Sequence, residues 1–137
     1  LLNSNKSIQL GALYPTRDFS YIKDTINGFI LMAKSKKSIG EVVNIGSGYE
    51  ISIGDLYDLI CKIMDVKNQI NTDITRIRPK KGEVSRLKAD NKKAKKLIGW
   101  MPEYSNRKGL TEGLRETVKW FKNKDNIVSY KSDRYTT

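Results

Sequence analysis

The residues best suited to chemistry lie near the start of the chain, where an arginine stands beside an acid. We interpret Arg17 and Asp18 as part of a positively charged loop. A short strand is predicted over residues 19–22, and Asp24 then stands where a helix cap belongs. A guanidinium and a helix N-terminus that face the same point can bind an anion. A surface arginine before an ordinary strand–helix turn would give the same residues, and both interpretations stay open.

The composition excludes several classes of active site. The 137 residues include no histidine and a single cysteine, Cys61. Without histidine there is no His-based acid–base catalysis, no Ser-His-Asp triad and little basis for a zinc site, so we predict no metal. A lone cysteine forms neither an internal disulfide nor a Cys-x-x-Cys site. Cys61 falls within an apolar helical pattern, and we predict that it is a buried core residue of a cytoplasmic protein.

The apolar runs and the first residues bear on location. No run approaches the roughly 18 consecutive apolar residues that a membrane span requires, so we predict no membrane partner. The chain lacks an initial methionine and a signal-peptide pattern. We therefore expect it to begin in the middle of a longer protein.

The net charge of +11 makes a polyanion partner worth weighing. Most of the 26 basic residues are lysines, whereas nucleic-acid domains more often cluster arginines among exposed aromatic residues. The densest run, residues 92–96, shares a helical stripe with Leu97 and Ile98, so we interpret it as the solvated face of a short helix. We predict no nucleic-acid partner. A basic module for nucleic acid or another polyanion is the alternative function, and an interaction or dimerisation domain without a ligand is a third.

The apolar periodicity alternates between the two regular structures and predicts an α/β chain. The helix after Asp24 carries an apolar stripe, and Ser52 with Asp55 resembles a capping box. The run 41–45 is typical of a strand buried in a parallel sheet. Strands are also predicted over 7–10 and 70–77, with a loop over 78–83, and helices are predicted over 24–35, from Ser52 to Met64, from Asp90 to Gly99 and over 107–124.

One apparent cofactor motif is rejected. Gly46-Ser47-Gly48 follows a predicted strand and precedes a helix, as a dinucleotide-binding turn does. Ile51 occupies the place of the third glycine, and no acid follows at the distance that would bind a ribose. The turn therefore does not predict NAD binding.

One apparent catalytic motif is rejected as well. Tyr104 and Lys108 have the Tyr-x-x-x-Lys spacing of short-chain dehydrogenases. That pair must share one helix face so that the lysine lowers the pKa of the tyrosine. Pro102 and the polar residues after Tyr104 place the tyrosine before the helix begins, so we interpret the spacing as a coincidence.

Several short segments, taken in order, resemble one known family. They are Arg17-Asp18-Phe19-x-Tyr21-Ile22-x-Asp24, Val43-Asn44-Ile45-Gly46, Arg78-Pro79, Leu97-Ile98-Gly99-Trp100-x-Pro102 and Gly109-Leu110-x-x-Gly113-Leu114. Nearly the whole chain resembles the C-terminal portion of the extended short-chain dehydrogenase/reductases that act on nucleotide sugars, the NAD-dependent epimerase/dehydratase family. The segments 15–19 and 83–90 look closest to the 4,6-dehydratases of legionaminic-type sugar pathways.

This resemblance implies a fold, a cofactor and an organisation. The chain would be the substrate-binding C-terminal part of an extended Rossmann-type enzyme and would lack the N-terminal NAD-binding sheet. Residues 1–124 would form the nucleotide-sugar-binding portion and residues 125–137 a polar tail. The missing half would bind NAD and hold the catalytic residues, so this chain alone would be inactive. The enzyme would oxidise a nucleotide sugar at C4 and then epimerise it or eliminate water, as a homodimer.

The resemblance also implies which residues meet the substrate. Arg17 and Arg78 match arginines that approach the diphosphate in the family, and a diphosphate favours planar bidentate donors. Asn44 matches a position near the nucleotide, although an ordinary turn asparagine is an equal alternative. Arg86 is a second-rank anion contact. Asp24 and Asp90 are assigned to helix capping, and Trp100 and Trp120 to packing.

Overall fold

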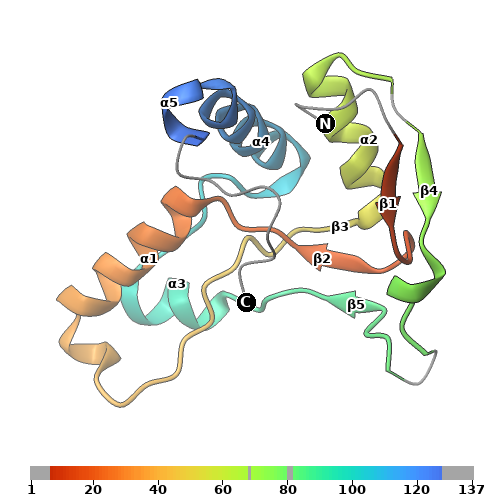
Figure 1. The fold of residues 1–137 in the computed structure, drawn as a ribbon. Helices are drawn as coiled ribbons and strands as arrows, with labels where there is room; N and C mark the ends of the chain where they lie inside the picture. Colours follow the sequence, from red (N-terminus) through yellow and green to blue (C-terminus); the bar gives the residue numbers. More distant parts are fainter. Residues whose placement is uncertain (1–6, 68, 80–81, 128–137) are drawn as a thin grey trace.

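The computed structural model describes residues 7–67, 69–79 and 82–127. Its strands are β1 (Ile8–Leu10), β2 (Thr16–Asp18), β3 (Glu50–Ser52), β4 (Ile70–Thr72) and β5 (Arg86–Leu87). In one small sheet β2 lies between β3, to which it is antiparallel, and β5, to which it is parallel (Figure 1). In the other, β1 pairs with β4 in parallel. The mixture of strands and helices confirms the predicted α/β class.

The helices lie beside the three-stranded sheet β3-β2-β5, which we call the central sheet. They are α1 (Ile22–Lys34), α2 (Ile53–Met64), α3 (Lys92–Ile98), α4 (Asn106–Lys122) and α5 (Lys124–Ile127), with 3-10 turns η1 (Lys36–Ser38) and η2 (Ile74–Arg76). The core joins Ile51 of β3, Leu59 of α2 and Leu110 of α4. Burying each such side chain contributes about 1.5–3 kcal/mol. The described helices include none that is long and apolar enough to cross a membrane.

Two helix ends follow their predicted signals. The Ser52 Oγ accepts a hydrogen bond from the Asp55 amide at 3.0 Å, which confirms the cap at the start of α2. Gly99 has φ +68° and ends α3 in the left-handed conformation that glycine tolerates best. Asp90 accepts from the Lys92 amide at 3.0 Å, although Asn91 is the residue that precedes the helix.

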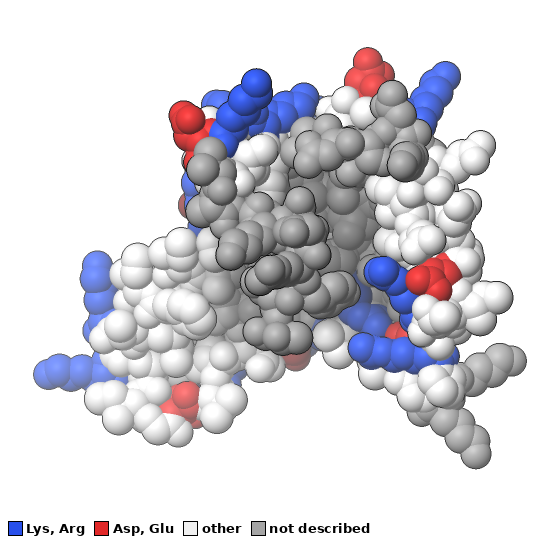
Figure 2. All heavy atoms as spheres, in the orientation of Figure 1, with Lys and Arg blue, Asp and Glu red and all other residues white. Residues whose placement is uncertain are grey.

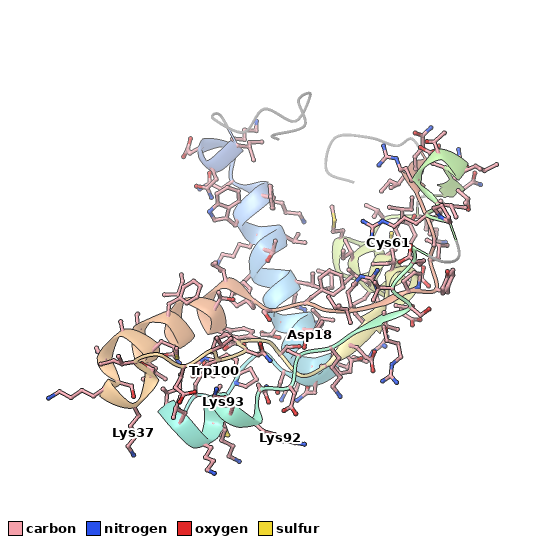
Figure 3. All side chains as sticks on the ribbon, turned by 90° about the horizontal axis from the view of Figure 1, so that it is seen from below. Asp18, Lys37, Cys61, Lys92, Lys93 and Trp100 are labelled. Atoms are coloured by element: carbon pink, nitrogen blue, oxygen red, sulfur yellow. The ribbon has the colours of Figure 1, made fainter. Side chains whose placement is uncertain are left out.

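Asp24 is not the predicted helix cap. The helix begins at Ile22, so Asp24 lies inside its first turn and is only 4% exposed. Its carboxylate accepts from the amides of Glu103 at 2.9 Å and Tyr104 at 3.0 Å. Trp100 donates from Nε1 to the Asp24 carbonyl at 3.1 Å and lies between α1 and α3 (Figure 3). Asp24 therefore joins α1 to the segment that leads into α4, and Trp100 is the packing residue that was predicted.

Other predicted elements shift. The predicted strand over 19–22 is wrong, because β2 ends at Asp18 and α1 starts at Ile22. The predicted strand over 70–77 is only partly formed, since η2 follows β4 closely. Cys61 is half-buried, so its predicted burial in the core is wrong. α5 occupies the start of the predicted tail, and residues 128–137 lie outside the described residues.

The predicted buried strand over 41–45 is wrong for this chain, because the segment pairs with no partner among the described residues, forms no strand and is largely exposed. Gly28 of α1 lets that helix approach the segment closely, because a Cβ there would come within 2.9 Å of the Ile45 side chain. Val42 is 83% exposed. The apolar stripe of α1 is also open, with Phe29 66% exposed. We call Ile22, Ile26, Phe29, Ile30 and Val42 the open apolar face, and its α1 part lies in the broad uncharged area at the left of Figure 2.

Candidate functional site

Arg17 lies in β2 and not in a loop. Its Nη1 donates to the carbonyl oxygens of Thr16 at 2.8 Å and Val84 at 2.7 Å. Its Nη2 donates to Glu83 Oε1 at 2.9 Å, and the Glu83 side chain is only 9% exposed. Arg17 therefore already holds the loop before β5 in place, and an anion that binds its guanidinium has to share it with Glu83.

Arg86, on the neighbouring strand, is held by a different acid. The register pairs Thr16 with Arg86, and both side chains donate to Glu50, Thr16 Oγ1 at 2.6 Å and Arg86 Nε at 3.1 Å. The hydrogen bonds from Arg86 and then from Thr16 lower the pKa of Glu50 to about 2. Because successive side chains of a strand point to opposite faces, Arg17 and Arg86 lie on opposite faces of the sheet.

The other two candidate residues, Arg78 and Asn44, have exposed side chains. Arg78 is exposed and makes no hydrogen bond or ion pair with the residues that the structure describes. Asn44 is exposed as well, and within the described part of the chain its side chain makes no hydrogen bond. Asn44 lines a surface hollow, whereas Arg17, Arg78 and Arg86 do not. Of the four candidates, only Asn44 is thus among the described residues that line this hollow.

The hollow has a volume of about 570 Å³ and lies between α1, the segment 43–46 and the segment 87–90. Its wall is mixed in chemistry, with apolar side chains beside hydroxyl, amide, ammonium and carboxylate groups. The residues that line it are Asp18, Ser20, Thr25, Phe29, Val43, Asn44, Ile45, Gly46, Leu87, Lys88, Ala89 and Asp90. A group that offers both apolar and hydrogen-bonding surface would fit such a wall.

Asp18 lies where β2 meets two other segments of the chain (Figure 3). Its Oδ1 accepts from the Ser47 amide at 2.9 Å and the Ser47 hydroxyl at 2.5 Å. Its Oδ2 accepts from the amides of Gly48 at 2.8 Å and Ala89 at 3.1 Å. One carboxylate therefore ties β2 to the 46–48 turn and to the segment after β5.

Close packing at Gly46 reinforces that junction. A Cβ at Gly46 would come within 2.3 Å of the Ala89 Cβ, a distance that no folded protein tolerates, so only glycine fits there. The Asn91 side chain also donates to the Gly46 carbonyl at 3.1 Å. The 46–48 turn and the segment 87–91 are consequently in direct contact.

This junction tests whether the chain itself could hold NAD. A dinucleotide turn binds pyrophosphate through free backbone amides. In the 46–48 turn the amides of Ser47 and Gly48 both donate to Asp18. The protein's own carboxylate occupies these amides, so this turn does not fit the pyrophosphate of NAD, and the geometry supports the rejection of this motif.

The rejected tyrosine–lysine pair lies as expected. α4 begins at Asn106, so Tyr104 precedes the helix and Lys108 lies within it. The Tyr104 ring contacts the Tyr21 ring, with the ring centroids 4.5 Å apart. The two residues do not share a helix face, and the structure gives them no catalytic arrangement.

The lysine-rich run is a solvated face, as predicted. Ala94 is fully buried, while the lysines of α3 are exposed. Lys93 contacts Glu41 at 2.7 Å, and Lys92 lies 3.9 Å from Asp90. Part of the positive charge of this helix is therefore already paired with acids.

The sequence analysis placed Asp18 beside Arg17 but did not predict its hydrogen bonds to the 46–48 turn, and it did not identify Glu83 as the partner of Arg17 or Lys88 as a residue of the hollow. The signal for Asp18 was present, because a Gly-Ser-Gly turn leaves backbone amides that need an acceptor. An acid that alternates with Arg17 along a strand is a natural candidate for one. No comparable local signal marks Glu83 as the partner of Arg17.

Comparison with known proteins shows which family these features belong to. The family described as GDP-mannose 4,6 dehydratase matches residues 1–113. The chain is 37% identical over 123 residues to a putative UDP-glucose 4-epimerase of Methanocaldococcus jannaschii. The aligned region covers 90% of this chain and 36% of that protein. It is 36% identical over 118 residues to the UDP-glucuronate 4-epimerase of Thermodesulfobacterium geofontis, covering 85% of this chain and 32% of that protein.

A solved structure agrees. The UDP-glucuronic acid 4-epimerase from Bacillus cereus, in complex with UDP-glucuronic acid and NAD, matches with a TM-score of 0.74 and 33% identity over 86% of this chain and 36% of that one. The chain therefore belongs to the family of NAD-dependent nucleotide-sugar epimerases and dehydratases, within the extended short-chain dehydrogenase/reductases. It spans about a third of the length of the relatives that it matches.

The family assignment confirms part of what the sequence predicted. NAD is the cofactor of the family, and the fold matches Rossmann-type enzymes. The relatives named here are epimerases, while the matching family is described by a dehydratase. The legionaminic-type branch, the division at residue 124 and the four substrate residues stay predictions.

Proposed function

We propose that this chain forms the nucleotide-sugar side of the cleft in an NAD-dependent nucleotide-sugar epimerase or dehydratase. One observation carries the proposal. The chain is 33% identical to the Bacillus cereus enzyme whose structure contains both UDP-glucuronic acid and NAD, and it covers 36% of that enzyme. The family match over residues 1–113 supports the same conclusion.

The role proposed for this chain is to bind and orient the diphosphate of the nucleotide sugar. Arg17 and Arg78 are the proposed donors, because a planar guanidinium forms two parallel hydrogen bonds to a phosphate. Arg86 adds positive charge from the neighbouring strand, on the opposite face of the sheet from Arg17, and Asn44 is the proposed contact near the nucleotide. Glu83 and Glu50 hold two of these guanidinium groups in fixed places, so less side-chain freedom is lost on binding.

Residues outside this chain would bind NAD. The groups that carry out the chemistry would also lie outside it. The occupied amides of the 46–48 turn support this division. The chain alone is therefore expected to be inactive. A homodimer and a location in the cytoplasm stay predictions of the same proposal.

Calorimetry on the 137-residue chain tests the proposal. Uridine diphosphate or guanosine diphosphate should bind stoichiometrically, while NAD should give no saturable heat at the same concentrations. If neither nucleoside diphosphate binds, the proposed role is wrong. If NAD binds at micromolar concentration, the division between this chain and the cofactor is wrong.

A salt titration separates this proposal from a basic module for polyanions. For such a module, log Kd for duplex DNA would rise steeply and linearly with the logarithm of the salt concentration. The slope would be proportional to the number of phosphates neutralised. The proposed site should bind duplex DNA weakly and should discriminate between uridine diphosphate and inorganic pyrophosphate. Equal affinity for both, together with a steep salt slope for DNA, would favour the polyanion module.

A further inference from the structure

Three segments that carry candidate substrate residues converge on one carboxylate. Asp18 directly follows Arg17 in β2. Its two oxygens accept hydrogen bonds from the 46–48 turn, two residues after Asn44, and from Ala89, three residues after Arg86. Arg17, Asn44 and Arg86 belong to separate stretches of sequence, and the Asp18 side chain bonds directly to the backbone near two of them.

We propose that Asp18 is a positioning residue for nucleotide binding, and this inference rests on the proposed function. Its carboxylate fixes the spacing between β2, the 46–48 turn and the segment 87–90. Asp18 itself, Gly46 of the turn and residues 87–90 all line the hollow of about 570 Å³ that Asn44 also lines. Asp18 therefore sets the relative places of groups that would bind the nucleotide, without itself donating to it.

The negative charge of Asp18 and its proposed positioning role predict opposite changes in the Kd of a nucleoside diphosphate. A carboxylate close to an anion site opposes anion binding by direct repulsion. If Asp18 acted only through its charge, replacing it by asparagine would tighten the binding of a nucleoside diphosphate. A positioning role requires the opposite result, because an asparagine side chain has one acceptor oxygen and turns an NH2 group towards backbone amides that also donate.

The chain contains a matched control for this substitution. Asp24 is buried, whereas Asp18 is half-buried. Like that of Asp18, its carboxylate accepts hydrogen bonds from backbone amides, those of Glu103 and Tyr104. Asp24 does not line the hollow. Asp18→Asn and Asp24→Asn thus remove the same kind of contact at two places, of which only one adjoins the proposed site.

A milder pair covers the case in which Asp18→Asn does not fold. Ser47→Ala removes the hydroxyl that donates to Asp18 at 2.5 Å and leaves the carboxylate and the backbone amides in place. Ser38→Ala removes another buried hydroxyl, one that donates to the carbonyl oxygens of Met32 in the last turn of α1 and of Ser35 just after it. Neither control residue lines the hollow.

The experiment is calorimetry of the full 137-residue chain with uridine diphosphate, repeated with guanosine diphosphate, on variants shown by circular dichroism to be folded. Asp18→Asn should raise Kd at least about tenfold and Ser47→Ala about threefold, while Asp24→Asn and Ser38→Ala should stay within about twofold of the wild type. Hydrogen exchange at the amides of Gly48 and Ala89 should accelerate in Asp18→Asn and not in Asp24→Asn.

Each outcome decides the matter. An unchanged or lower Kd in Asp18→Asn, or in Ser47→Ala if the first variant is unfolded, overturns the positioning role while the proposed function stands. Equal losses in the Asp18 and Asp24 variants would mean general destabilisation and would overturn it too. If the wild type binds neither nucleotide, the proposed function fails and this inference fails with it.

Discussion

Arg17 and Asp18 are neighbours in β2, yet the Arg17 side chain bonds to the segment before β5 and the Asp18 side chain to the segment after it. Arg17 Nη2 lies 2.9 Å from Glu83 Oε1, in the loop before β5. Asp18 Oδ2 lies 3.1 Å from the Ala89 amide, in the segment after β5. The alternation of side chains along a strand separates the two roles, so β5 is held by β2 at both of its ends.

The first prediction concerns Arg17. Arg17→Ala should raise the Kd for uridine or guanosine diphosphate by about ten- to a hundredfold, the loss of one charge-assisted phosphate contact. Arg17→Lys should recover only part of the affinity, because an ammonium keeps the charge but lacks the planar pair of donors. Calorimetry measures both, and wild-type affinity in Arg17→Ala would show that the diphosphate does not bind there.

Arg78 offers a cleaner test of the same site. It makes no hydrogen bond or ion pair with the described residues, so Arg78→Ala should leave the melting temperature unchanged. The Kd for the nucleoside diphosphate should nevertheless rise about ten- to a hundredfold.

Lysines of α3 serve as controls for Arg78. Lys93→Ala and Lys96→Ala should change the Kd by no more than about twofold, because these side chains lie on a solvated helix face. The pair between Lys93 and Glu41 is exposed and contributes little. If the lysine variants weaken binding and Arg78→Ala does not, the anion site has been assigned to the wrong part of the chain.

A third prediction concerns acid stability through Glu50. Hydrogen bonds from Arg86 and Thr16 lower its pKa from 4.5 to about 2 in the folded chain. A carboxyl whose pKa is depressed by folding stabilises the fold above its unfolded pKa, and that contribution is lost as the pH falls through the folded pKa. The free energy of unfolding should therefore decrease between about pH 4.5 and pH 2.

Chemical denaturation at several pH values measures this effect. Glu50→Gln should flatten the decrease in that window, since glutamine does not titrate. Arg86→Ala should move the pKa of Glu50 back towards its ordinary value, which an NMR titration would follow. An unchanged Glu50 pKa in Arg86→Ala would mean that the pair does not form in solution.

Local signals in the sequence were sufficient to predict those helix ends that are set by capping residues close by in the sequence. Ser52 and Asp55 lie within one turn, and Gly99 follows the last residue of α3, so each signal acts between near neighbours. These features depend on residues a few positions apart, which is the range that sequence patterns report.

Contacts between residues far apart in the sequence determine the features that the sequence did not predict. An aspartate before an apolar run fits a helix cap, but Asp24 bonds to amides that lie 79 and 80 residues further along the chain. Asp18 bonds to Ala89 over a separation of 71 residues. β2 lies at Thr16–Asp18 and not at 19–22 because its partners are Glu50–Ser52 and Arg86–Leu87. A single sequence does not reveal these pairings, and it therefore did not reveal the acids that hold Arg17 and Arg86.

The last prediction concerns self-association through the open apolar face. Residues 41–45 have no strand partner among the described residues, and unpaired backbone beside exposed apolar side chains favours pairing with another chain. We expect the 137-residue chain to form a dimer or larger species whose population rises with concentration, as measured by light scattering. Lysine at the edge of a sheet opposes such pairing, so Val42→Lys should raise the concentration needed for association at least about tenfold.

Ile74 provides the matched control, because it is also β-branched and is 80% exposed against 83% for Val42. It lies in η2, which is separated from α1 and residues 41–45 by the central sheet (Figure 1). Ile74→Lys makes the same change in charge and hydrophobicity at a site outside the open apolar face, so association should be unchanged. A wild-type chain that stays monomeric at high concentration contradicts the prediction. Equal effects of Val42→Lys and Ile74→Lys would show instead that net charge, and not this face, controls association.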